Sequence, residues 1–160
     1  MSLFSFTYYM IRPYHPDDLE PLRLVFRQNT PLYFAEHEET DLIDYLNRLE
    51  NPQFVYVENG QVLGTAGYYI RANETWGGLA WVFVAPDCQQ QGVGGQLVAH
   101  CLTEIRRYPA MARIDVRTSQ HADGFFAKFG FVQVDFKPDF WAPGIHLCHM
   151  ELPAERIAGH

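Results

Sequence analysis

A glycine-rich turn between an apolar run and an amphipathic segment is the part of the chain that most plainly predicts chemistry. Residues 82–85 are apolar, and Gly92, Gly94 and Gly95 follow seven to ten residues later. Beyond Gly92, apolar residues recur with a helical period, at Val93, Leu97, Val98, Cys101, Leu102 and Ile105. This pattern predicts a helix packed on a sheet. The first N–H groups of such a helix lack intrahelical acceptors and lie at the positive end of its dipole, so the turn is suited to a pyrophosphate.

Two well-known phosphate-binding loops do not fit this turn. The dinucleotide-binding fingerprint requires a glycine three residues after Gly94, where the chain has Leu97. A P-loop requires Gly-Lys followed by Ser or Thr, and that tripeptide does not occur. The anion would therefore belong to a different class of cofactor, unless the segment is an ordinary strand-to-helix turn.

The spacing Gln89-x-x-Gly92-x-Gly94 resembles the acyl-CoA signature of the GNAT superfamily of N-acetyltransferases. The resemblance implies that the strand before the signature separates from its neighbour and offers free backbone groups to the pantetheine and the acetyl carbonyl. On side chains alone, that strand is an ordinary buried β-strand, and this interpretation is compatible with a role for its backbone. The residues that the resemblance assigns to acetyl-CoA are Val82, Phe83, Val84, Gln89, Gln90, Gln91, Gly92, Val93, Gly94, Gly95 and Gln96.

A second resemblance lies in residues 119–131, which are similar to the closing helix, turn and strand of the superfamily. Ala122, Phe125, Lys128, Gly130 and Phe131 occupy matching positions. Two positions depart from the pattern, and both belong to the predicted cofactor and catalytic set. Ser119 replaces the usual Asn, and Phe126 replaces the Tyr that usually protonates the departing CoA thiolate.

Composition predicts one globular domain spanning residues 1–160. The chain is 48% hydrophobic and 15% aromatic, and neither a linker nor a repeat divides it. The net charge of −7 disfavours nucleic acid as a partner. An anionic cofactor would therefore be bound by backbone amides and a few nearby cations. The four candidate cations are Arg106, Arg107, Arg113 and Lys128.

The cysteines and the N-terminal residues predict the cytoplasm and no membrane association. Three cysteines without a CxxC pair indicate a reducing compartment. Residues 1–10 are apolar but lack a preceding basic residue and soon meet Arg12-Pro13, so they predict a first strand and not a signal peptide or membrane span.

The periodicity predicts an α/β domain whose order of elements is similar to the GNAT acyltransferase fold. That fold is a single mixed, mostly antiparallel central sheet of six to seven strands, flanked by about four helices. Asn59-Gly60 predicts a tight hairpin turn. Strands are predicted at residues 6–12, 54–57, 62–70, 78–84, 112–118, 131–136 and 145–152, and helices at 16–28, 41–49, 92–107 and 122–129.

Transfer of an acetyl group to an amine requires an uncharged nucleophile, and several acids are candidates for the base that provides it. Asp115 lies on the strand expected beside the cofactor strand, and Glu38 lies in the segment between the first two helices, near Glu36, His37 and Glu39. The resemblance places that segment at the acceptor site. Each of these residues is otherwise an ordinary solvated charge, and the sequence does not rank them.

Aromatic residues in loops predict walls for the acceptor. Tyr33, Phe34 and Trp141 are the candidates, with core packing as the alternative. His146, Cys148 and His149 are close in sequence, but on a strand His149 points away from the other two, so no metal site is predicted. Cys88 is interpreted as a small buried residue and not as a reactive thiol.

Together the motifs predict an acetyl-CoA-dependent N-acetyltransferase that acts on a primary amine by direct attack, without a metal. Two alternatives stay open: a CoA-binding sensor that has lost catalysis, for which Phe126 is the best support, and an acyltransferase for longer acyl chains. The acceptor amine is not identified, and a homodimer is compatible with the sequence.

Overall fold

The computed structural model describes residues 8–71 and 73–157, in which seven strands form one sheet. The strands are β1 (Tyr9–Pro13), β2 (Gln53–Glu58), β3 (Gln61–Arg71), β4 (Trp76–Val84), β5 (Arg113–Thr118), β6 (Val132–Ala142) and β7 (Ile145–Leu152). The α-helices of the described residues are α1 (Leu19–Gln28), α2 (Glu38–Arg48), α3 (Val93–Ile105), α4 (Asp123–Ala127) and α5 (Ala154–Ile157). This α/β architecture confirms the predicted fold class.

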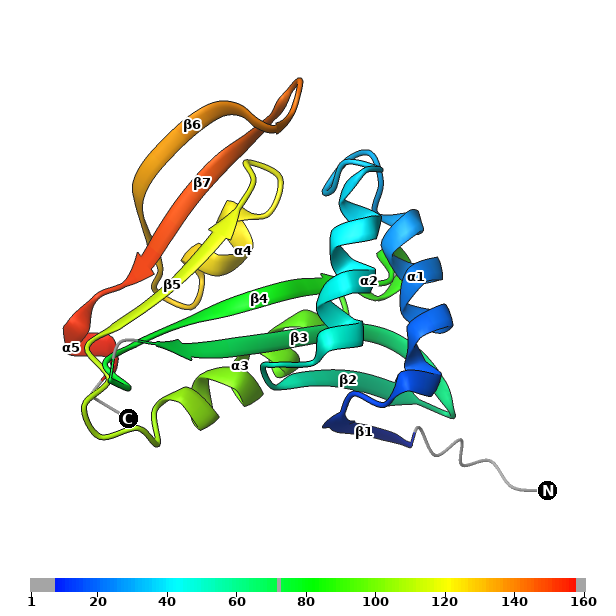
Figure 1. The fold of residues 1–160 in the computed structure, drawn as a ribbon, viewed down its shortest axis with the longest axis horizontal. Coiled ribbons are helices and arrows are strands. Elements are labelled where there is room, and N and C mark those ends of the chain that lie inside the picture. The colour runs from blue at the N-terminus through cyan, green and yellow to red at the C-terminus, as the bar shows by residue number, and fades with distance from the viewer. Residues whose placement is uncertain (1–7, 72, 158–160) are drawn as a thin grey trace.

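The sheet has the order β1-β2-β3-β4-β5-β7-β6, and every neighbouring pair except β4–β5 is antiparallel. Figure 1 shows the consequence of the one parallel pair, since β5, β6 and β7 rise away from the plane of β2, β3 and β4. The sheet therefore consists of two halves that join near the start of β4.

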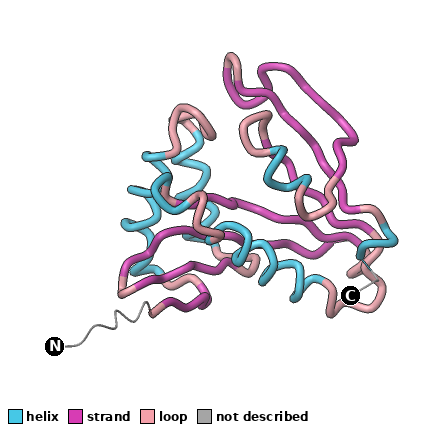
Figure 2. Tube along the Cα trace, turned by 180° about the vertical axis from the view of Figure 1, so that it is seen from behind, coloured by secondary structure: helices cyan, strands magenta, loops and turns pink. Residues whose placement is uncertain are grey.

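The helices cover both faces of the N-terminal half of the sheet. Helices α1 and α2 lie on one face, and the reverse view shows α3 crossing the other (Figures 1 and 2). Helix α3 buries the apolar stripe that its sequence predicts, with Leu97, Val98 and Cys101 fully inaccessible to solvent. Helix α1 buries Leu22 and Phe26 in the same way. These two layers hold β4 between them.

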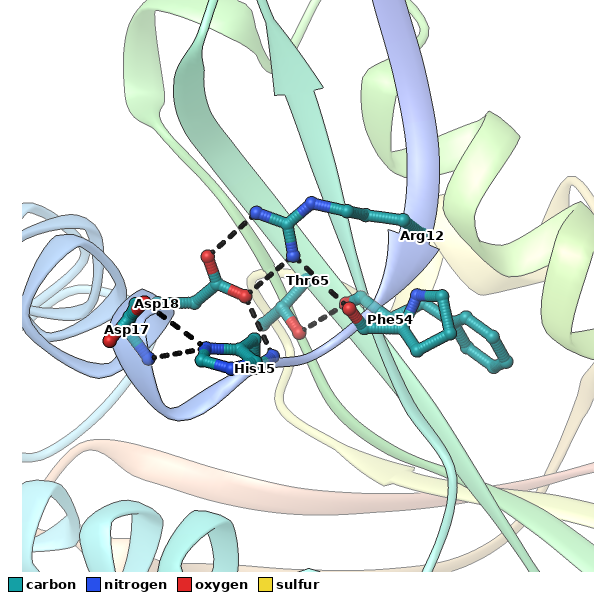
Figure 3. A network of polar contacts seen from close by, with 7 residues as sticks. Arg12, His15, Asp17, Asp18, Phe54 and Thr65 are labelled. Atoms are coloured by element: carbon teal, nitrogen blue, oxygen red, sulfur yellow. Dashed lines mark hydrogen bonds and ion pairs between the residues drawn. The ribbon is translucent and has the colours of Figure 1, made fainter.

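A polar network fixes β1 to the start of α1, as Figure 3 shows. The guanidinium of Arg12 donates to both carboxylate oxygens of Asp18, at 2.8 and 2.9 Å, and the backbone N–H of His15 donates to the same carboxylate at 2.8 Å. Burial raises the pKa of Asp18, but the hydrogen bonds from Arg12 and His15 outweigh it and lower that pKa overall. Beside this network, the hydroxyl of Thr65 donates to the carbonyl of Phe54 at 2.6 Å.

The predicted elements are present, with differences at their ends. Strand β6 continues to Ala142 instead of ending at Phe136, because β7 pairs with it at Lys137 and again at Ala142, on either side of an irregularity. Helix α2 begins at Glu38, three residues earlier than predicted. The predicted strand at residues 6–12 is present from Tyr9, and residues 6 and 7 lie outside the described residues. The short helix α5 was not predicted.

Within the described residues, no helix combines the length and the apolar character needed to span a bilayer.

Candidate active site

Strands β4 and β5 separate soon after they meet. Their parallel ladder has three residue pairs, from Trp76–Arg113 to Gly78–Asp115. Beyond Gly78, β4 continues to pair with β3 on its other side as far as Val84. The edge of β4 that faces β5 therefore has no strand partner beyond Gly78. The resemblance implies such a separation for the strand before the signature, and its assignment of residues 82–84 to the cofactor stays a prediction.

A β-bulge lies in β4 where the two strands have separated. The ladder with β3 shifts register between Thr65 and Gly67, so that Trp81 and Val82 together face a single residue, Ala66. Trp81 adopts a positive φ of 50°. Its ring packs against Phe26 and Phe34, with centroids 6.3 and 6.1 Å apart. The bulge redirects the β4 backbone at the middle of the opening.

A cavity of about 590 Å³ occupies the space between the separated strands. Both strand edges line it, β4 with residues 79–84 and β5 with residues 116–118. Most of the predicted site residues meet there. Those that line the cavity are Tyr33, Phe34, Glu38, Val82, Phe83, Val84, Gln89, Gly94, Ser119, Phe126 and Trp141.

The start of α3 lies beside this cavity. The first hydrogen bond of the helix runs from the N–H of Gln96 to the carbonyl of Gly92 at 3.0 Å, so the N–H groups of residues 93–95 have no intrahelical acceptor. Gly92 has φ of +80°, which favours glycine. Of the predicted signature residues, Gln90, Gln91, Gly92, Val93, Gly95 and Gln96 do not line the cavity itself.

Gln89, the first residue of the signature, joins the end of β4 to the α1–α2 segment. Its side-chain amide donates to Asn29 Oδ1 at 3.0 Å, and its oxygen accepts from the hydroxyl of Tyr33 at 3.3 Å. Asn29 is buried and donates to the carbonyls of Val25 and Val84 at 2.8 and 3.0 Å. These bonds fix one wall of the cavity. No motif pointed to Asn29, because a single Asn after a helix is a common C-terminal residue.

A family model described as an acetyltransferase (GNAT) domain matches residues 34–154, well over half of the chain. The protein belongs to the GNAT acetyltransferase family.

Solved structures similar to this chain share its fold. The ribosomal-protein-S18-alanine N-acetyltransferase from Escherichia coli superposes with a TM-score of 0.75 at 18% identity, covering 92% of this chain and 94% of that one. The N-acetyltransferase from Staphylococcus aureus superposes with a TM-score of 0.71 at 17% identity, covering 92% of this chain and 99% of that one. The structure of yncA from Salmonella typhimurium, solved with its cofactor acetyl-CoA, superposes with a TM-score of 0.69 at 21% identity. The match covers 91% of this chain and 94% of that one.

The two residues that depart from the GNAT pattern both lie at the cavity. Phe126 is buried and packs edge-on against Phe125 and Phe131, with ring centroids 5.0 and 6.1 Å away. Ser119 is buried, and its Oγ accepts from the N–H of His121 at 3.3 Å. Ser119 thus supports the turn into α4, while the aromatic ring at position 126 provides no proton.

Glu38 is the candidate base that the structure places in the cavity wall. The residue is 7% exposed, and one carboxylate oxygen accepts from the N–H of Ala35 at 2.8 Å. Burial raises its pKa, and although the hydrogen bond from Ala35 opposes that change, the pKa remains above its ordinary value. Asp41, one turn along α2, lines the cavity as well. A buried carboxylate with a raised pKa is a stronger base than an ordinary glutamate and is suited to accept a proton.

Asp115, the other principal candidate, lies behind the cavity wall. It is 2% exposed and accepts from the Tyr69 hydroxyl at 2.5 Å, with His149 Nε2 3.1 Å away. Tyr69 lines the cavity, whereas Asp115 does not. Burial and the hydrogen bond to Asp115 raise the pKa of Tyr69, so this phenol keeps its proton. The hydrogen bond to Tyr69 connects Asp115 to the cavity wall.

The remaining candidates lie elsewhere. Glu36, His37 and Glu39 do not line the cavity, and Glu39 accepts from Arg27 at 2.6 Å. Of the four candidate cations, Lys128 lines the cavity, while Arg106 and Arg107 do not. Arg113 forms an ion pair with Glu151 at 2.8 Å.

The predicted exclusion of a metal site rested on side-chain direction in β7. His146 Nδ1 accepts from the N–H of Asp139 at 2.9 Å, whereas His149 contacts Asp115 on β5. No group of three or more metal-ligating side chains occurs among the described residues. Cys88 is buried, and burial raises its pKa, which disfavours a reactive thiolate.

We expect Glu38→Gln to stabilise the protein at neutral pH, because the parent must hold a charged carboxylate in a buried site. The folded protein binds the Glu38 proton more tightly than the unfolded chain, so the parent loses stability relative to the variant as pH rises through the raised pKa. The gain in Tm should be below about 4 °C and should vanish at acidic pH. Thermal unfolding from pH 4 to pH 8 measures it.

Glu39→Gln is the matched control with the opposite sign. The hydrogen bond from Arg27 lowers the pKa of Glu39, so its removal should reduce stability at neutral pH. If Glu38→Gln lost as much stability at neutral pH as Glu39→Gln, the charged Glu38 carboxylate would not be destabilised by burial, and this account of position 38 would be wrong.

Proposed function

We propose that the protein is an acetyl-CoA-dependent N-acetyltransferase that transfers the acetyl group to a primary amine by direct attack. The observation that carries this proposal is the cavity between the separated β4 and β5, which joins free backbone edges, the start of α3 and a buried carboxylate. Two structural neighbours, yncA and an aminoglycoside 6'-N-acetyltransferase, were solved with acetyl-CoA and CoA respectively.

In this proposal the cofactor lies along the free edge of β4 and ends at α3. Backbone groups of residues 82–84 pair with the pantetheine, and the N–H groups of residues 93–95 bind the pyrophosphate at the positive end of the helix. The protein has a net charge of −7, so this anion must be bound by local dipoles rather than by overall charge. Of the four cations named from the sequence, Lys128 lines the cavity and would assist.

The amine attacks the thioester carbonyl from the side of α2. Its nitrogen forms a bond to the carbonyl carbon, the carbon–sulfur bond then breaks, and the CoA sulfur leaves as a thiolate. Glu38 takes the proton that the amine must lose, directly or through a water molecule. Because Phe126 has no proton to give, the thiolate is protonated by solvent or by a hydroxyl of the cavity wall, for which Ser119 and Tyr33 are candidates.

We expect Glu38→Gln to lower the rate at saturating acetyl-CoA by about 10²- to 10⁴-fold, the usual contribution of a general base. The rate of the parent should rise with pH through the raised pKa of Glu38. This rising limb of the pH–rate profile should be absent in the variant. A thiol-release assay against a panel of primary amines and peptide N-termini measures it. Glu36→Gln, an exposed neighbour outside the cavity, should retain the parent profile.

Asp115→Asn separates the two candidate bases. Loss of the rising limb in Asp115→Asn, with Glu38→Gln retaining it, would transfer the base role to Asp115 acting through Tyr69. Parent-like profiles in both variants would remove both residues from the mechanism. CoA binding without turnover of any amine would favour the alternative of a sensor.

We expect Gly94→Val to weaken CoA binding by at least about tenfold. A Cβ atom at Gly94 would lie 3.3 Å from Phe125 Cζ, so the further methyl groups of valine would displace Phe125 at the cavity wall or shift the start of α3. Ala99→Val places the same β-branched side chain on an exposed position of α3 and should bind CoA as the parent does. Titration calorimetry that finds equal affinities for Gly94→Val and the parent would refute the assigned cofactor site.

We expect Phe126→Tyr to keep or raise the transfer rate. Phe126 lies in the cavity wall, and tyrosine adds the hydroxyl that can protonate the leaving thiolate. The measurement is the rate at saturating acetyl-CoA, with CoA affinity determined in parallel. A large fall in rate at unchanged CoA affinity would show that position 126 serves another purpose.

A further inference from the structure

Arg117 lies in the cavity wall, above an aromatic surface at the end of β6. Its guanidinium carbon is 5.1 Å from the ring centroid of Phe140 and 6.0 Å from that of Trp141. The two rings meet edge to face at 4.9 Å. Such a surface holds a guanidinium plane in place without using its hydrogen-bond donors.

The donors of Arg117 form no ion pair with an acid in the described part of the chain. Within residues 8–71 and 73–157, no carboxylate forms an ion pair with Arg117 or with Lys137, whose Nζ lies 5.9 Å from the Phe140 ring. By contrast, Arg113, four residues earlier on the same face of β5, pairs with Asp115 and Glu151. Two cations of an acidic protein thus meet at one ring without a counter-charge.

The surface that carries Arg117 is held rigidly, although β6 is an exposed edge strand. Trp141 Nε1 donates to the carbonyl of Thr118 at 3.1 Å. Gln120 clamps the turn of the β6–β7 hairpin, because its amide donates to the Gly144 carbonyl at 2.7 Å and its oxygen accepts from the N–H of His146 at 2.9 Å. These bonds hold the hairpin against the segment that follows β5, so Phe140 and Trp141 form a fixed wall.

The opposite wall of the cavity has the opposite charge. Glu38 and Asp41 lie at the start of α2 and line the same cavity as Arg117. In Figure 1, α2 and the β6–β7 hairpin stand on the two sides of the opening above β4. An ammonium group is attracted to the α2 side and an anion to the β5 side, so a ligand carrying both charges has one preferred orientation.

We propose that the acceptor is an amine that also carries a carboxylate, and that Arg117 binds this carboxylate on the wall formed by Phe140 and Trp141. The inference rests on the proposed function, since it deepens the description of the same cavity. A guanidinium presents paired donors that match both oxygens of a carboxylate, and orientation by Arg117 turns the amine toward Glu38 and the β4 bulge. The carboxylate can belong to a free amino acid or to an acidic residue next to a peptide N-terminus.

The test compares matched ligands on protein saturated with CoA, which binds the acceptor without reacting. The probes are phenylalanine and leucine, each against its α-carboxamide, and the dipeptide amides Ala-Asp-NH₂ and Ala-Asn-NH₂. Affinities come from calorimetry, and transfer rates are measured with acetyl-CoA on the same series. We expect at least one carboxylate ligand to bind about tenfold or more tightly than its carboxamide partner.

Arg117→Gln should abolish that preference while leaving the affinity for CoA unchanged, and Arg117→Lys should restore part of it. Arg107→Gln removes an exposed arginine beyond α3, outside the cavity, and should retain the full preference. A preference confined to the dipeptide pair identifies a peptide acceptor, and one confined to the amino acids identifies a small molecule.

The outcomes separate this inference from the proposed function. Acetyl transfer without any preference for carboxylates, or a preference that survives Arg117→Gln, would overturn the inference and leave the N-acetyltransferase intact. A preference lost in Arg117→Gln without acetyl transfer to any probe would support the anion site and count against the proposed reaction. Absence of both binding preference and transfer would reject both.

Discussion

The parallel ladder between β4 and β5 ends at Gly78 and Asp115, and this early end creates the candidate site. A buried strand edge with free N–H and C=O groups is costly unless water or a ligand satisfies them. Layers on both faces of the sheet hold β4 in place, with the aromatic cluster of Phe26, Phe34 and Trp81 on one side and α3 on the other. The packing of these two layers therefore offsets the free energy that the unpaired edge of β4 costs.

The point where the two strands part is reinforced by side chains. The Tyr69 hydroxyl reaches from β3 across Gly78 to Asp115 on β5, and a side chain at Gly78 would collide with both. His149 on β7 approaches the same carboxylate. Side chains of three strands, β3, β5 and β7, thus meet over Gly78 of β4, where β4 and β5 begin to separate. This arrangement gives Asp115 a positioning role whatever its part in proton transfer.

Much of the fold follows from local patterns in the sequence. The apolar period of residues 93–105 and the Asn59-Gly60 turn each predicted an element that the structure contains. The two motifs also predicted the family, which the match over residues 34–154 confirms. The extension of β6 was missed because its residues 137–140 are exposed and contain Pro138, so the strand conformation depends on pairing with β7 at Lys137 and Ala142.

The site was less predictable, because its key features depend on contacts between distant segments. The sequence did not rank Glu38 and Asp115 as candidate bases. Tertiary packing distinguishes them, because it puts Glu38 in the cavity wall and Tyr69 between Asp115 and the cavity. The bulge at Trp81 has no local signal, since nothing in residues 76–84 favours a positive φ at a tryptophan. Asn29 and Arg117 belong to no motif, and their roles arise from partners far away in the sequence.

The central claim is that acetyl-CoA lies between the separated strands, with its pyrophosphate at the start of α3. The most direct measurement is a titration of isotope-labelled protein with acetyl-CoA, followed through backbone amide chemical shifts. The account predicts the largest changes at residues 82–84 and 93–96, together with slower hydrogen exchange along the free edge of β4, while β1 and β2 stay unchanged. Saturable binding with changes concentrated outside β4, β5 and the start of α3 would contradict it.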